Sequence, residues 1–199
     1  MGKRYITANQ LLEDAFTLGF HILGSGFRPD LLLAVWRGGT PVAIAIQELL
    51  SHGGVEHLHY AIRTRHYQGI DNRYNEVEIE GLECALASAT RHGREVNAIL
   101  IVDDVHDTGL SIAAIINALE RHFDNTSPNR PRPVIRVAMP YFKPSQNRTG
   151  RIPDYYLHST DEWIVFPHEL LGLSAKEISA KNMSVLDRLR EEGKEGSDG

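Results

Sequence analysis

Residues 99–111 read ILIVDDVHDTGLS, and this stretch decides the fold. Its first four residues are apolar and mostly β-branched, which predicts a strand that is buried on both faces. Two adjacent acids, Asp103 and Asp104, follow the strand, and a third acid precedes the Thr-Gly pair that opens a helix from Leu110. A strand, an acidic turn and a helix in this order are typical of α/β proteins, in which ligands bind beyond the carboxyl ends of the strands.

The alternation of buried strands and helices continues in both directions from this stretch. We expect strands at residues 31–36, 57–62, 76–80, 98–102 and 134–142, and helices at residues 7–23, 41–51, 81–92, 110–122 and 175–192. Residues 63–75 are polar and contain turn-forming residues, so we expect a long loop there. The pattern predicts an α/β fold with a mostly parallel central sheet flanked by helices, in a single domain over residues 1–192 that is followed by a disordered tail at residues 193–199.

The composition limits the partners and the compartment. A formal net charge of -5 provides no broad basic face for nucleic acid. No apolar run approaches the length of a membrane span. The single cysteine, Cys84, cannot form an intrachain disulfide, which is typical of proteins from a reducing cytosol. We therefore expect a cytoplasmic protein that binds small molecules and neither nucleic acid nor a membrane.

The residue types that follow the central strand suit a sugar phosphate. The two adjacent carboxylates of Asp103 and Asp104 can accept hydrogen bonds from the two hydroxyls of a ribose. The turn at residues 107–111 directs backbone N–H groups to one point in front of a helix, which favours a phosphate. Gly109 allows the backbone to approach that phosphate closely, and Asp107 stands where it can exchange a proton.

Other interpretations of the same residues have to be weighed. Each acid alone is compatible with a solvated strand end, and Asp107 or Thr108 alone with an ordinary helix cap. The spacing Asp-Asp-x-x-Asp also occurs in the metal site of isoprenyl diphosphate synthases, but that site lies on a helix, whereas residues 98–102 are strand-like. The sequence lacks the GxxxxGK[ST] pattern of nucleotide-binding P-loops.

Residues 101–111 closely resemble the motif with which type I phosphoribosyltransferases bind phosphoribosyl diphosphate (PRPP), the most specific signature of that family. The resemblance extends from about residue 5 to residue 173. Residues 35–39 (VWRGG) are similar to the family's pyrophosphate loop. Residues 142–144 (FKP) and 161–169 (DEWIVFPHE) resemble the purine-binding part of bacterial hypoxanthine and xanthine–guanine enzymes.

The resemblance implies specific roles on the PRPP side. Asp103 and Asp104 would bind the ribose hydroxyls, partly through Mg²⁺, and Asp107 would face N7 of the purine as the catalytic acid or base. The 5-phosphate would be wrapped by the segment that consists of Asp107, Thr108, Gly109, Leu110 and Ser111. The pyrophosphate would be held by Arg37, Gly38, Tyr67 and Arg73, with a cis peptide bond before Arg37 and with the last two residues in a closing hood.

On the base side, Lys143 would bond the exocyclic O6 of the purine, Trp163 would pack on its face and the Ile164 backbone would meet its edge. Glu169 would stand near a second Mg²⁺, although relatives usually carry Asp there. The hood and base-binding part would comprise about residues 1–10 and 143–173. Two further departures are His66-Tyr67 in place of Ser-Tyr and Leu110-Ser111 in place of Gly-Thr.

The implied activity is the Mg²⁺-dependent transfer of ribose 5-phosphate from PRPP to a 6-oxopurine, namely hypoxanthine, guanine or xanthine, with release of a nucleoside monophosphate and pyrophosphate. The sequence does not indicate which of the three bases is preferred. Two alternatives remain open: a PRPP-sensing regulatory protein of the same fold, and a phosphoribosyltransferase for another base. The resemblance also implies a homodimer or homotetramer.

Overall fold

The computed structural model describes residues 2–66, 77–179 and 181, and it divides the chain into two compact units. The smaller unit combines Met1–Leu11 with Glu162–Gly199, and the larger unit is Leu12–Asp161. The predicted single domain over residues 1–192 stays a prediction. No helix in the described part of the chain is long and apolar enough to cross a bilayer.

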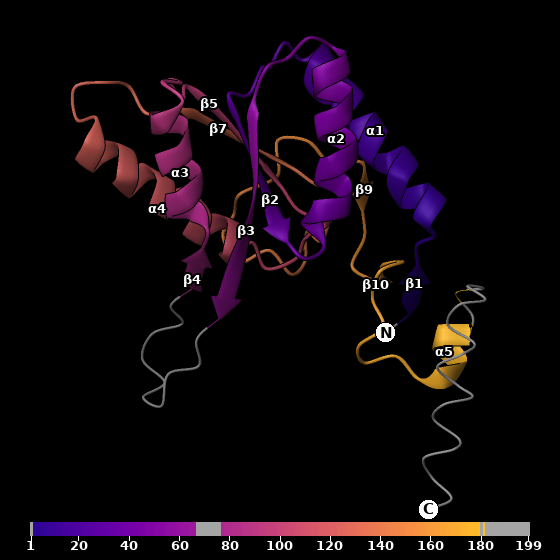
Figure 1. The fold of residues 1–199 in the computed structure, drawn as a ribbon. Coiled ribbons are helices and arrows are strands. Elements are labelled where there is room, and N and C mark those ends of the chain that lie inside the picture. Colours follow the sequence, from indigo (N-terminus) through magenta and orange to yellow (C-terminus); the bar gives the residue numbers. More distant parts are fainter. Residues whose placement is uncertain (1, 67–76, 180, 182–199) are drawn as a thin grey trace, which may run out of the picture. The chain divides into compact units, whose positions relative to one another are not determined.

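The larger unit is built on a five-stranded sheet (Figure 1). Its strands, in spatial order, are β4 (Val77–Glu80), β3 (Leu58–His66), β2 (Leu31–Trp36), β5 (Ala98–Val102) and β7 (Val134–Ala138). All neighbouring pairs are parallel except β3 and β4. The runs LLLAV and ILIV are buried at every position, as expected for strands that are covered on both faces. The predicted α/β fold with a mostly parallel central sheet is confirmed.

Helices cover both faces of this sheet. Helices α3 (Leu82–Arg91) and α4 (Leu110–Thr126) lie on one face, and α1 (Ala8–Gly24) and α2 (Gly39–His52) lie on the other (Figure 1). The first face buries alternate strand residues against the apolar stripes of α3 and α4, and the cluster includes Leu31, Leu33, Val35, Ile99, Ile101, Leu82, Leu86, Ile112, Ile115 and Leu119. Burying each such side chain stabilises the fold by roughly 1.5–3 kcal/mol. Because β5 and α4 both contribute to this cluster, their packing holds the turn between them in place.

The prediction of a loop from residue 63 is wrong for its first part. Strand β3 continues to His66 and pairs antiparallel with β4. Arg65 Nε lies 3.0 Å from Glu80 Oε1, and Arg63 Nη1 lies 4.0 Å from Glu80 Oε2. This segment is polar because its charged side chains pair with the edge strand β4, and charged side chains are common at sheet edges. Tyr67 and Arg73 lie outside the described residues.

A second, three-stranded sheet brings three later segments together. It consists of β6 (Val105–His106), β8 (Tyr141–Phe142) and β9 (His158–Ser159), in the parallel order β6-β8-β9. The strand predicted at residues 134–142 is thus divided into β7 and β8, separated by Met139 and Pro140. Proline has no backbone N–H to continue the β7 ladder, and β8 turns to pair with β6 instead.

The smaller unit has a two-stranded parallel sheet of β1 (Lys3–Tyr5) and β10 (Trp163–Val165). The backbone N–H of Ile6 donates to Val165 O (3.0 Å) and extends this pairing. Helix α5 (Ala175–Ser179) follows. It occupies the start of the helix predicted at residues 175–192, and residues 180 and 182–192 lie outside the described part of the chain.

Candidate active site

The acid pair lies where β5 ends. The Asp103 N–H donates to Ala138 O on β7 (3.1 Å), and the Asp104 N–H donates to Asp103 Oδ1 (2.9 Å). Both side chains are half-buried. Burial raises the pKa of the Asp103 carboxyl well above its ordinary value, and the negative charge of Asp104 raises it further. The pair is therefore a concentration of negative charge that hydroxyl donors or a cation would stabilise.

The loop between β2 and α2 packs directly on these acids. A Cβ atom on Gly38 would lie 1.7 Å from Asp104 Oδ2, and one on Gly39 would lie 2.5 Å from Val102 O and 2.8 Å from Asp103 Cα. At Gly39 the nearest atoms belong to the backbone, so only glycine fits there, whereas a side chain at Gly38 would have to displace the Asp104 carboxylate. The peptide bond between Trp36 and Arg37 is cis, as the family resemblance implied. Thus the segments predicted to bind pyrophosphate and ribose are adjacent in the structure.

The turn between the acids and α4 depends on a second steric constraint. Gly109 has φ +77° and ψ -2°, a left-handed conformation, at the residue before α4. A Cβ atom there would lie 2.6 Å from both His106 Nε2 and Thr149 Oγ1. The Leu110 N–H donates to Thr108 Oγ1 (3.4 Å), at the start of a helix whose first N–H groups have no partner within the helix. Residues 108–111 therefore form a turn of the kind that binds phosphate.

Asp107 and Lys143 form an ion pair beside this turn. Lys143 Nζ lies 3.1 Å from Asp107 Oδ2, and the two side chains are 8% and 45% exposed, respectively. The Lys143 N–H donates to His106 O (2.9 Å), because β8 pairs with β6 and Lys143 directly follows β8. The nearly buried ammonium of Lys143 and the half-exposed carboxylate of Asp107 are thus held next to each other. The sequence pattern points to each residue separately, but it contains no local signal for this contact between residues 36 apart.

His106, between the acids, is buried and belongs to the core. Its ring packs edge-on against Phe142, with ring centroids 5.6 Å apart. Burial lowers its pKa, so the neutral imidazole is favoured at pH 7. The imidazole also lies against Gly109, where a Cβ atom would be 2.6 Å from its Nε2.

The remaining base-side residues belong to the smaller unit. Trp163 in β10 is 56% exposed, whereas Ile164 is buried and pairs with Arg4 of β1. Glu169 follows β10, and its Oε2 accepts a hydrogen bond from the Phe166 N–H (3.2 Å). Its role as a metal ligand stays a prediction.

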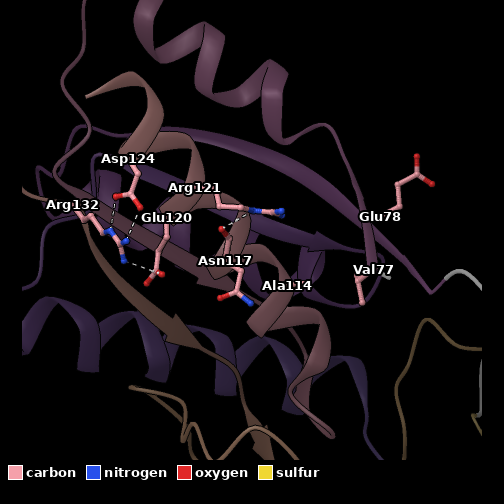
Figure 2. A pocket seen from close by; sticks show the side chains of 8 residues that line it. All are labelled: Val77, Glu78, Ala114, Asn117, Glu120, Arg121, Asp124 and Arg132. Atoms are coloured by element: carbon pink, nitrogen blue, oxygen red, sulfur yellow. Dashed lines mark hydrogen bonds and ion pairs between the residues drawn. The ribbon is translucent and has the colours of Figure 1, made fainter. Parts of the chain in front are cut away.

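A cavity elsewhere on the larger unit contains none of the predicted site residues. It has a volume of about 930 Å³ and lies between α4 and the start of β4 (Figure 2). Its lining residues are Val77, Glu78, Ala114, Asn117, Glu120, Arg121, Asp124 and Arg132. Arg132 bridges Asp124 (2.6 Å) and Glu120 (3.0 Å), so it offsets part of the negative charge in this part of the cavity. Among the described residues, no cluster of three or more His, Cys, Asp or Glu side chains is arranged to hold a metal ion.

Comparison with known proteins agrees with this geometry. Xanthine phosphoribosyltransferase 1 of Saccharomyces cerevisiae is 24% identical over 200 residues, which cover 90% of this chain and 95% of the relative. The solved purine phosphoribosyltransferase of Pyrococcus horikoshii is 25% identical with a TM-score of 0.62, and the match covers 87% of this chain and 99% of that chain. The xanthine-guanine-hypoxanthine phosphoribosyltransferase of Helicobacter pylori shares the fold, with a TM-score of 0.60 and 21% identity. The match covers 91% of this chain and 97% of that chain. Residues 7–171 match the family described as "Phosphoribosyl transferase domain", and the chain belongs to this family.

Proposed function

We propose that this protein transfers ribose 5-phosphate from PRPP to a 6-oxopurine base and releases pyrophosphate. The observation that carries the proposal is the 3.1 Å contact between Lys143 and Asp107, directly beside the acid pair and the phosphate-type turn. The names of the relatives support it, since the matched proteins of S. cerevisiae, P. horikoshii and H. pylori are xanthine, purine and xanthine-guanine-hypoxanthine phosphoribosyltransferases.

PRPP has three groups that need partners, and the larger unit offers one for each. The carboxylates of Asp103 and Asp104 accept hydrogen bonds from the ribose hydroxyls. The N–H groups of residues 108–111 receive the 5-phosphate at the start of α4. Gly38 lies against Asp104. Arg37 and Gly38 hold the pyrophosphate, to which the Arg37 guanidinium supplies charge-assisted hydrogen bonds.

The base is recognised by the ion pair. The Lys143 ammonium is a donor only, so it bonds a ring carbonyl such as O6 and meets an exocyclic amine badly. Asp107, paired with the same ammonium, exchanges a proton with N7 of the base as the bond to the ribose forms. As the family resemblance implies, Trp163 would pack on the purine face and the Ile164 backbone would contact its edge. As pyrophosphate departs, positive charge develops on the ribose, and the transition state resembles an oxocarbenium ion. Holding the base in line with the ribose removes a large part of the entropic barrier.

The acid pair suits Mg²⁺. This ion prefers oxygen ligands and is often bound by one or two carboxylates together with substrate phosphates. Burial and then the negative charge of Asp104 raise the pKa of Asp103, and a cation between the two carboxylates would offset both effects. Asp103 and Asp104 would therefore hold Mg²⁺ together with PRPP, and Glu169 would assist a second ion. When bound, Mg²⁺ would neutralise the negative charge of the leaving pyrophosphate.

The experiment that tests this proposal is a steady-state assay with PRPP, Mg²⁺ and a panel of bases. We expect nucleotide formation with at least one of hypoxanthine, guanine and xanthine, and poor use of adenine, uracil and orotate. PRPP binding without turnover of any base would favour the sensing role, and turnover of a pyrimidine alone would refute the purine assignment.

A further inference from the structure

The C-terminal segment contacts strand β1 and the residues that follow β10, and the proposed function does not account for these contacts. Glu177 in α5 accepts hydrogen bonds from Lys3 Nζ and from Tyr5 OH (3.1 Å), both on β1. Its second oxygen accepts hydrogen bonds from the Ser174 N–H and Oγ–H, both at 2.8 Å. The bonds from Lys3 and then Ser174 lower the pKa of Glu177 to about 2, so the carboxylate is charged throughout the neutral range.

Lys181 holds the chain that follows β10. Its ammonium donates to the carbonyl oxygens of Phe166 (2.6 Å), Pro167 (3.2 Å) and Glu169. An ammonium has three N–H donors, and here each has a backbone acceptor. Burial lowers the pKa of Lys181, and the carbonyl oxygens replace part of the lost hydration. Residues 166–169 are thus tied to a single side chain.

The two contacts affect β10 indirectly: Glu177 binds its partner strand β1, and Lys181 binds the residues that follow it. In the β1–β10 pairing, Lys3 is opposite Trp163 and Tyr5 is opposite Val165. Residues directly opposite one another share a face of a sheet, so Glu177 binds the β1 side chains on the face that carries Trp163. Lys181 fixes the residues that immediately follow Val165. The position of β10 therefore depends on α5 and on Lys181.

We propose that Glu177 and Lys181 are positioning residues that hold the base-binding strand β10 in place, and that they set the affinity for the purine without touching it. The inference rests on the proposed function, in which Trp163 and Ile164 contact the base. Precise placement matters because a displacement of about 1 Å at a substrate contact can change the rate by up to about 10²-fold. The residues that bind PRPP lie in the larger unit and are held by other contacts.

The test compares Lys181→Met and Glu177→Gln with the wild type. Both changes keep the size of the side chain and remove its charge. We expect the KM for the base to rise about tenfold and the KM for PRPP to stay within about twofold. The matched control is Lys176→Met, which removes an exposed ammonium from α5, the helix that contains Glu177. It should leave the KM for the base and the KM for PRPP unchanged. Lys181→Arg restores a cationic donor and should recover part of the affinity for the base.

Hydrogen exchange provides a readout that needs neither substrate nor activity. In Lys181→Met, the amides of residues 163–166, 168 and 169 should exchange faster, while those of β5 should keep their wild-type rates. Wild-type turnover with an unchanged KM for the base in both variants would overturn the proposal, as would a parallel rise of both KM values. Failure of the proposed function itself would look different: the wild type would not turn over any purine, whatever the exchange rates.

Discussion

The turn after β5 and the turn after β8 contribute opposite partners to one ion pair, and they are built in different ways. The turn after β5 is a continuous strand–turn–helix whose glycine, at φ +77°, and adjacent acids are all local in sequence. The turn after β8 contributes one lysine, and its position depends on the pairing of β8 with β6. The proposed phosphate side of the site therefore rests on backbone geometry, and the proposed base side rests on side chains that tertiary structure brings together.

The largest effect is expected at the point where the two turns meet. Asp107→Asn keeps the shape of the side chain and removes the acid/base group, so kcat should fall by about 10²-fold or more with PRPP affinity largely retained. Stopped-flow or steady-state kinetics and calorimetry measure the two quantities. Near-normal turnover of this variant would remove Asp107 from the chemistry.

The next effect separates the base side from the phosphate side. An unmatched buried donor costs about 1–3 kcal/mol, so the wild type should prefer hypoxanthine over adenine by roughly tenfold to a few hundredfold. Lys143→Ala should abolish most of this preference and leave PRPP binding intact. The ratio of the kcat/KM values for hypoxanthine and adenine measures this preference. A ratio that is the same in Lys143→Ala and the wild type would show that Lys143 does not recognise O6.

The acid pair tests the phosphate side alone. Asp103→Asn combined with Asp104→Asn removes charge-assisted hydrogen bonds worth about 2 kcal/mol, which corresponds to roughly thirtyfold in the Kd for PRPP. The Mg²⁺ dependence of the rate should also become weaker. If calorimetry gives the wild-type Kd for PRPP, the two acids serve only the structure.

The smallest effect concerns the backbone contact that joins the β2–α2 loop to the acids. Gly39→Ala forces a Cβ atom to within 2.5 Å of Val102 O, and overpacking of this kind costs about 1–3 kcal/mol. Tm should fall by several degrees, at about 2–4 °C per kcal/mol for a chain of this size. Gly24→Ala is the control, because a Cβ atom there meets nothing within 4 Å. Equal Tm values for the two variants would contradict the close packing.

The same contrast explains how much the sequence could predict. Buried strands such as LLLAV and the acidic turn after β5 were predictable, because periodicity and local turn chemistry determine them. The extension of β3 to His66 was not, since the alternating Arg63 and Arg65 are polar by composition and are held by Glu80 on another strand. The contact between Asp107 and Lys143 spans 36 residues and depends on strand pairing, which has no local signal. The fit of Gly39 against Asp103 was missed too, although the Gly-Gly pair was a signal for it.

The stoichiometry of the reaction with PRPP and hypoxanthine is the sharpest test of the proposed transfer. We expect nucleoside monophosphate and pyrophosphate to form in equal amounts, and we expect neither product when PRPP is omitted or Mg²⁺ is chelated. Guanine and xanthine should be measured beside hypoxanthine. Absence of nucleotide with all three bases, or release of pyrophosphate without nucleotide, would contradict the account.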